Sequence, residues 1–251
     1  MFEYSENSIN GVYLCTPQHV EDGDCRAVDD EYYTNLALIS MGSYDIGLLT
    51  VNGIKTIAFK GPLSPGSGDI LVKILKKHPE VKTLVLSSTG GMQEDAFKII
   101  DYIKNKDYTT WVPAKRACLS ACSSIFLSGT TRILEGQLGL HTGIYKLRHI
   151  SQVRDMEVAQ DTVNEALFQN NTYLLKKIEI YTNLGLPFSK VSRLMETIVD
   201  AKGEFLVFHS MEELTSFDPS NEYIKTMDEI GATVKTQELI NFEFNNYEPL
   251  I

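Results

Sequence analysis

The chain has 251 residues, of which 43% are hydrophobic, enough to bury one sizeable core. Its 33 acidic and 23 basic residues give a net charge of -10, which repels a phosphate backbone and argues against nucleic-acid binding. No apolar run approaches the roughly 18 residues that a membrane-spanning helix needs. We therefore expect no nucleic-acid partner and no membrane span in the given chain.

The sequence leaves the compartment open. Its start, MFEYSENSING, lacks the basic and apolar regions of a secretory signal. A periplasmic or secreted location is favoured if a signal peptide was removed, and a cytoplasmic one otherwise.

Four cysteines fall into two pairs along the chain. Cys15 and Cys25 lie in a polar, loop-like segment without metal-binding partners, so they are interpreted as a disulfide or, equally, as free thiols. Cys118 and Cys122 are four residues apart and would share one face of a helix, which favours small buried hydrophobic side chains.

The first half of the chain predicts alternating strands and helices after a polar extension over residues 1–35. In YDIGLLTVNGIKTIAFKGPL, two apolar runs around Asn52-Gly53 predict a hairpin. SGDILVKILKKHPE has helical periodicity closed by Pro79, and VKTLVLSS is typical of a strand buried on both faces.

The alternation continues after the Gly90-Gly91 turn. QEDAFKIIDYIKNK predicts a helix, YTTWVP a strand, and the segment around Ser120 a further helix. This order indicates an α/β domain, in which ligands gather at the carboxyl ends of the strands. The turns after Ser88 and Pro113 lie at those ends.

The second half predicts more helix and one strand. A long amphipathic helix ends at Gly185, and FSKVSRLMETIV predicts a shorter one. EFLVFHSMEEL is typical of a strand followed by a helix that Ser210 caps, with Glu213 three residues later. We divide the chain into the extension, a main domain over residues 36–217, and a polar tail over residues 218–251.

Ser120 is a candidate nucleophile if a base and oxyanion donors lie near it. The Gly90-Gly91 turn has no Cβ atoms, so its N–H groups can approach a substrate carbonyl. The N–H of Ala121, at the start of the predicted helix, is a second donor. His141 ends the apolar run LGLH and has an ordinary pKa suited to a general base.

Three segments in this order resemble the ClpP/crotonase superfamily: SSTGGMQEDAFKI, ACLSACSSIFLSGTTRI and GQLGLHTG. The likeness is closest to ClpP-like serine peptidases with a Cys-x-Ser-Ala-Cys nucleophile segment, which are often secreted or periplasmic. It extends over about residues 46–217, since the helix after His141 resembles the handle helix of those subunits and FHSMEEL their last strand and helix. It implies repeated β-β-α units with a mostly parallel sheet flanked by helices.

The resemblance also implies roles for individual residues. Ser120 corresponds to the nucleophile and His141 to the general base, and the N–H groups of Gly91 and Ala121 correspond to the oxyanion hole. The implied activity is serine-type peptide-bond hydrolysis of a peptide or protein substrate, without a metal or organic cofactor. Members are usually oligomeric, so residues 155–185 are a candidate homo-oligomer interface.

The third member of a catalytic triad departs from the family pattern. Aligned forward from Gly185, its position falls on Leu194, and aligned back from Phe208 it falls near Lys202. The nearest carboxylates are Glu196 and Asp200, and we prefer Asp200 because it lies outside the predicted helix. A Ser-His dyad is the alternative.

Three other functions remain open. A Ser-Lys dyad would use Lys146, Lys176 or Lys177, since a buried lysine with a lowered pKa acts as a base. A crotonase-type acyl-CoA enzyme uses the same oxyanion donors, but the acidic chain shows no basic surface for the nucleotide. A catalytically inactive ClpP-like binding or scaffold protein is favoured by the missing Asp.

Overall fold

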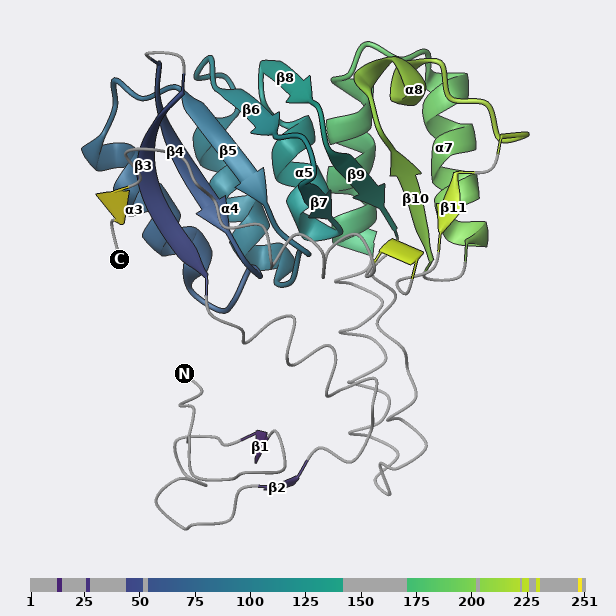
Figure 1. Ribbon diagram of the computed structural model, residues 1–251. Helices are drawn as coiled ribbons and strands as arrows, with labels where there is room; N and C mark the ends of the chain where they lie inside the picture. Colours follow the sequence, from purple (N-terminus) through teal and green to yellow (C-terminus); the bar gives the residue numbers. More distant parts are fainter. Residues whose placement is uncertain are drawn as a thin grey trace.

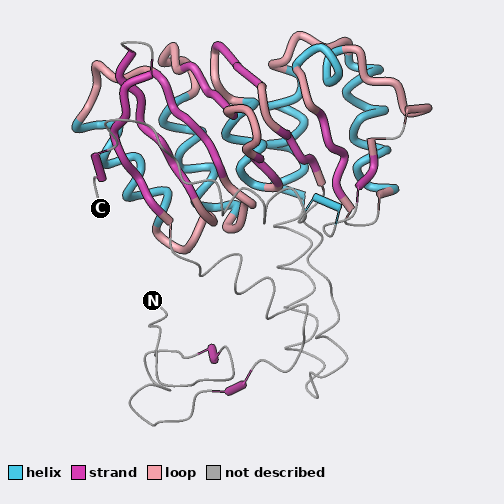
Figure 2. The backbone as a smooth tube through the Cα atoms, in the orientation of Figure 1, coloured by secondary structure: helices cyan, strands magenta, loops and turns pink. Residues whose placement is uncertain are grey.

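The computed structural model describes residues 44–51, 54–141, 171–201, 204–221 and 223–225, and the pairs 13–14, 26–27, 229–230 and 248–249. Figures 1 and 2 show strands on one side of the molecule with helices packed behind them. The larger sheet has six strands in the order β12-β3-β4-β5-β6-β8. Their bounds are β3 (Asp45–Val51), β4 (Ile54–Lys60), β5 (Thr83–Ser87), β6 (Thr109–Val112), β8 (Thr131–Leu134) and β12 (Glu248–Pro249).

Strands β3 and β4 form the predicted hairpin. They pair antiparallel with Val51 opposite Ile54, which leaves two residues to connect them. Those two residues, Asn52 and Gly53, lie outside the described part of the chain. The antiparallel register confirms that the two apolar runs pair with each other.

The rest of the larger sheet is mostly parallel, as an α/β fold requires. Strand β5 lies between β4 and β6 and runs parallel to both, and β6 runs parallel to β8. Leu84 and Leu86 enter the main core, whereas Val85 packs on the opposite face with Leu49 and Ala58. The prediction of a strand buried on both faces is thereby confirmed.

A smaller sheet of four strands has the order β11-β10-β9-β7. Its strands are β7 (Ala117–Leu119), β9 (Gln137–Leu140), β10 (Phe205–Phe208) and β11 (Ile224–Lys225). Strand β7 was not predicted, because three buried residues are too few to show a periodicity. The helix expected around Ser120 begins only at Ala121.

The helices agree with the predicted segments. Figure 1 shows α3, α4 and α5 behind the strands of the larger sheet. Ser210 caps α8 as predicted, because its hydroxyl accepts from the N–H of Glu213 at 3.1 Å. The helix that we expected to end at Gly185 has a described part over residues 171–182. The remaining bounds are α3 (Ser67–Lys77), α4 (Gln93–Ile103), α5 (Ala121–Leu127), α7 (Phe188–Asp200) and α8 (Met211–Thr215).

The two ends of the chain are described only in short pieces. In the extension, β1 (Tyr13–Leu14) pairs antiparallel with β2 (Arg26–Ala27). The polar tail contributes β11 to the smaller sheet and β12 to the larger one. Of the candidate interface over residues 155–185, the part before residue 171 lies outside the description. No helix in the described residues is long and apolar enough to cross a membrane.

Helices α3 and α4 meet at a glycine and a buried carboxylate. A Cβ atom on Gly68 would lie 2.4 Å from the carbonyl oxygen of Asp95, so only glycine permits this approach. The N-cap of α3 is Gly66, which has no side chain with which to cap the helix. Asp95 of α4 supplies a substitute, since its Oδ1 accepts from the N–H of Gly68 at 2.9 Å. A carboxylate at this position also interacts favourably with the helix dipole.

Replacing Asp95 by Ala is expected to lower the free energy of unfolding by about 2 kcal/mol, because a buried N–H loses its charged acceptor. Chemical denaturation measures the change. Asp101→Ala is the matched control on the same helix, where the exposed carboxylate bonds Lys104 at 2.8 Å. Its expected cost is less than about 0.5 kcal/mol, and equal losses for the two variants would contradict the capping role.

Candidate active site

Ser120 and His141 are in direct contact. The Nε2 atom of His141 lies 2.5 Å from the Oγ atom of Ser120, and both residues are partly exposed. Ser120 follows β7 directly and His141 follows β9 directly. Strands β7 and β9 are parallel neighbours, with Leu119 opposite Gly139, so their carboxyl ends meet at one edge. The strand pairing therefore brings together two residues that are 21 positions apart in the sequence.

The backbone of Ser120 is in an unusual conformation. Its φ of 55° and ψ of -124° place it in a region that residues with a Cβ atom rarely adopt, at a cost of about 1–3 kcal/mol. Two backbone hydrogen bonds hold it there. The N–H of Ser120 donates to the carbonyl of Gly139 at 2.9 Å, and the N–H of Ser123 donates to the carbonyl of Ser120 at 3.0 Å. The sharp turn between strand and helix presents the hydroxyl to His141.

The Gly90-Gly91 turn lies against Ser120. A Cβ atom on Gly90 would lie 2.5 Å from the Cβ atom of Ser120 and 3.0 Å from the nitrogen of Ala121. Gly90 and Gly91 also have φ values of 91° and 136°, which favour glycine. Within the described residues, the N–H groups of Gly91 and Ala121 donate to no other backbone group. The turn thus places Gly90 directly against Ser120 and the nitrogen of Ala121, and Gly91, the other predicted oxyanion donor, is the next residue.

His141 lies between an aromatic ring and a lysine. Its ring centroid is 4.4 Å from that of Phe205 in β10, and its carbonyl oxygen accepts from Lys177 Nζ at 2.7 Å. Burial, and then the positive charge of Lys177, lower the pKa of His141 to about 3. The imidazole is therefore neutral at neutral pH, with a lone pair free to accept a proton.

Neither of the two predicted carboxylates, Asp200 and Glu196, is hydrogen-bonded to His141. Asp200 is exposed at the last position of α7, and Glu196 on the same helix accepts from Ser192 at 3.2 Å. Among the described residues, no carboxylate forms a hydrogen bond with His141. Leu194, the position reached by the forward alignment, is fully buried in the core. Within the part of the chain that the structure describes, the contact therefore joins two residues, with no third residue bonded to the histidine ring.

Of the two candidate lysines that the structure describes, Lys177 lies at the site. It is 5% exposed, and burial lowers its pKa to about 8. Lys176, its neighbour in the sequence, lies 4.1 Å from the ring centroid of Phe97, and Lys146 is outside the described residues. Sequence reasoning could not separate Lys176 from Lys177, because the choice depends on which face of the helix over residues 171–182 points inward.

A disulfide joins Cys118 and Cys122 on either side of Ser120. Both residues are fully buried, as expected, but the interpretation as two unlinked side chains on one helix is wrong. Cys118 lies in β7 and Cys122 is the second residue of α5, so the chain turns sharply between them. Cys15 and Cys25, the pair for which a disulfide was weighed, lie outside the described residues.

A cavity of about 470 Å³ lies at the opposite end of α5 from Ser120. It is lined by charged side chains of both signs, and neither Ser120 nor His141 contributes to it. Within the described residues, no three His, Cys, Asp or Glu side chains form a group that could hold a metal ion. The Ser120–His141 contact is accordingly the arrangement on which we base a function.

A scan against protein-family models finds no match to this chain, and a search of curated proteins finds no relative either. The function is therefore argued from the geometry of the site and from the sequence motifs.

Replacing Lys177 by Met is expected to raise the free energy of unfolding at pH 7 by as much as about 3 kcal/mol. The lysine pKa is about 8 in the folded protein and 10.5 as its ordinary value, a difference that costs the buried ammonium roughly this much. Between these two pH values the unfolded chain binds more protons, so the stability of the native protein rises with pH. Denaturation at pH 7 to 10.5 should show this rise in the native protein and its loss in the variant.

Lys176→Met serves as the matched control, because it removes the neighbouring lysine on a partly exposed face. It should keep the pH dependence of the native protein. A Lys177→Met variant that is less stable at pH 7 and retains the rise would contradict a buried, destabilised ammonium.

Proposed function

We propose that the chain is a serine hydrolase that cleaves peptide bonds through an acyl-enzyme on Ser120, with His141 as the general base. The observation that carries the proposal is the 2.5 Å contact between His141 Nε2 and Ser120 Oγ. A serine hydroxyl at this distance from a neutral imidazole can lose its proton as it attacks. The positive φ of Ser120 supports it, since strained backbone collects at functional sites.

In the first step, Nε2 of His141 takes the Oγ proton while Oγ bonds to the carbonyl carbon of the substrate. The carbonyl oxygen becomes negative and accepts from the N–H groups of Gly91 and Ala121. The imidazolium then gives its proton to the leaving amine, and the carbon–nitrogen bond breaks. The products of this step are the free amine and an ester on Ser120.

In the second step, water attacks the ester carbonyl, and His141 takes its proton. The same two N–H groups hold the oxyanion, and the returned proton restores the Ser120 hydroxyl as the acid leaves. The Phe205 ring, tilted by 33° against the imidazole at a centroid distance of 4.4 Å, limits the rotation of the imidazole in both steps. The Lys177 hydrogen bond fixes the backbone from which the imidazole projects.

This site would work as a dyad. A carboxylate would stabilise the imidazolium that forms in each step, whereas the Lys177 ammonium opposes it. The low pKa of His141 means that the base is neutral and available at every pH above about 3. Its weak basicity predicts a slower enzyme than one with a triad.

The peptide substrate rests on the resemblance to ClpP-like serine peptidases. The mostly parallel sheet, the glycine turn beside the serine and the order of the three motifs support membership of the ClpP/crotonase superfamily, with its repeated β-β-α units. Assembly into a homo-oligomer through residues 155–185 is part of the same proposal. Leu175, in the described part of that segment, is 67% exposed and supports it.

A binding protein without catalytic activity is the second candidate. The observation that favours it is the positive neighbour of His141 in place of a carboxylate. In that case the glycine turn and the serine would hold a peptide carbonyl without attacking it.

Covalent labelling by a fluorophosphonate separates the two candidates. We expect one adduct per chain, mapped by mass spectrometry to Ser120 and absent in Ser120→Ala. His141→Ala should slow labelling by at least about 100-fold, the lower end of general-base effects. Ser128→Ala removes a serine at the opposite end of α5, where its hydroxyl donates to the carbonyl of Ser124, and should label at the native rate.

Hydrolysis of a quenched peptide library, with Ser120→Ala beside the native protein, tests the peptide substrate. Loss of cleavage in the variant would support the peptidase. Absence of both labelling and cleavage in the native protein, with peptide binding retained, would establish the binding protein instead.

A further inference from the structure

The disulfide between Cys118 and Cys122 closes a short loop with Ser120 at its centre. Cys118 belongs to the strand that ends at Ser120 and Cys122 to the helix that starts after it. The bond holds their Cα atoms 5.2 Å apart. It is therefore a covalent link between the two elements whose relative position defines the turn.

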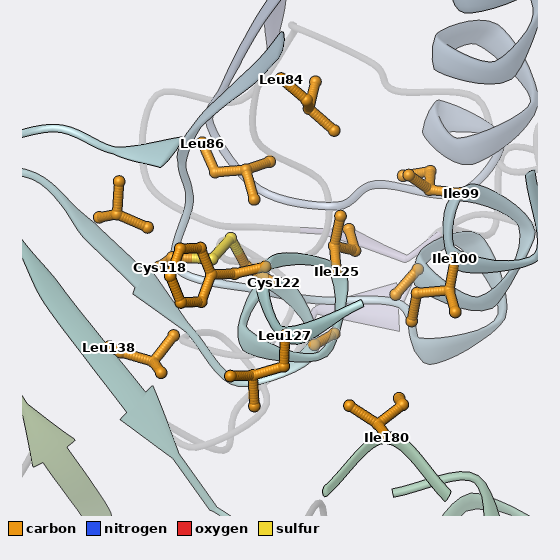
Figure 3. Close-up of a cluster of buried hydrophobic side chains, with 14 of the residues drawn as sticks. Leu84, Leu86, Ile99, Ile100, Cys118, Cys122, Ile125, Leu127, Leu138 and Ile180 are labelled. Carbon is orange, nitrogen blue, oxygen red and sulfur yellow. A yellow bond between two sulfur atoms is a disulfide. The ribbon is translucent and has the colours of Figure 1, made fainter. Parts of the chain in front are cut away.

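The bond is expected to add little to the free energy of unfolding of the whole domain. In the chain-entropy model, a disulfide stabilises more as its loop lengthens, and this one connects residues separated by only 4 positions. Figure 3 shows the bond among the hydrophobic side chains of the core, and both cysteines are fully buried. As free thiols they would still be small hydrophobic side chains in the same core.

The disulfide has a clearer role in the turn at Ser120, where it can restrain the backbone. A serine with φ of 55° is in a high-energy backbone conformation, so its conformational energy falls if the backbone relaxes to a negative φ. Relaxation would move Oγ relative to His141, and a misplacement of about 1 Å can cost 100-fold in rate. The disulfide limits how far the end of β7 and the first turn of α5 can separate, and so restricts this relaxation.

We propose that Cys118 and Cys122 are positioning residues whose disulfide holds Ser120 in its reactive geometry, so that the reactivity of the serine depends on oxidation of this pair. The inference rests on the proposed role of Ser120 as nucleophile. With the pair reduced, the protein stays folded but the hydroxyl is no longer held against His141.

Opening the bond takes two electrons from an external dithiol. One thiolate of the dithiol attacks a cysteine sulfur and releases the other cysteine as a thiolate. The second thiol of the reagent then breaks the mixed disulfide, and the reagent leaves as a cyclic disulfide. Both cysteines end as thiols after proton uptake, and an oxidant reverses the change.

The full chain carrying Cys15→Ala and Cys25→Ala tests the proposal, because Cys118 and Cys122 are then its only cysteines. Dithiothreitol reduces it, and alkylation in denaturant followed by mass measurement counts the thiols. Fluorophosphonate labelling at increasing probe concentration gives a limiting rate and a half-saturation concentration for each state. On reduction, we expect the limiting rate to fall at least about tenfold while the half-saturation concentration changes little. Reoxidation should restore the rate, and thermal unfolding should remain cooperative throughout.

Cys118→Ala/Cys122→Ala repeats the test if the buried bond resists the reagent, and it should label as slowly as the reduced protein. Equal limiting rates in the oxidised and reduced proteins, or an unchanged rate in this variant, would overturn the positioning role alone. Loss of the folded state on reduction would overturn it as well, because the bond would then support the whole fold. An oxidised protein that does not label at all would overturn the proposed function, and with it the purpose of the bond.

Discussion

The positive-φ backbone of Ser120 is the constraint on which the site depends. A strand that ends in a sharp turn and continues as a helix leaves its turn residue partly exposed at the end of the strand, here with its hydroxyl oxygen 2.5 Å from Nε2 of His141. The surroundings fit this turn: Gly90 leaves room for the Ser120 side chain, and Gly139 accepts the Ser120 N–H. The Cys118–Cys122 bond spans the same turn. Geometry that costs energy at one residue is thus maintained by several neighbours.

Local signals in the sequence predicted much of the fold. The hairpin around Asn52-Gly53, the buried strand β5 and the capping of α8 by Ser210 each depend on residues within a few positions of one another. Strand β7 escaped prediction because it has three residues, and it exists through its pairing with β9. The tail could not be placed for a similar reason: β12 is a strand only through its pairing with β3, about 200 positions away.

The same distinction holds for the candidate site: local motifs predicted some of its residues, and others depend on the packing of distant segments. The motifs at the strand ends, where parallel neighbours converge, predicted that Ser120 and His141 lie together. The oxyanion roles of Gly91 and Ala121 stay predictions. Lys177 was one of three indistinguishable lysines, and only the packing of its helix brings it to the His141 carbonyl. The carboxylate that the family pattern implies stays a prediction, with Asp200 exposed at the last position of α7. A basic residue contacts the backbone of the histidine, and its charge adds to burial, the larger cause, in lowering the pKa of the histidine.

The crystal structure of the protein after reaction with a fluorophosphonate tests the central claim most directly. The adduct mimics the tetrahedral intermediate, so its position shows what Ser120 and its neighbours do with a developing negative charge. The account predicts phosphorus bonded to Ser120 Oγ, with one phosphoryl oxygen about 2.7–3.1 Å from the N–H groups of Gly91 and Ala121. An adduct on another residue, or a phosphoryl oxygen that faces solvent with both N–H groups unused, would contradict it.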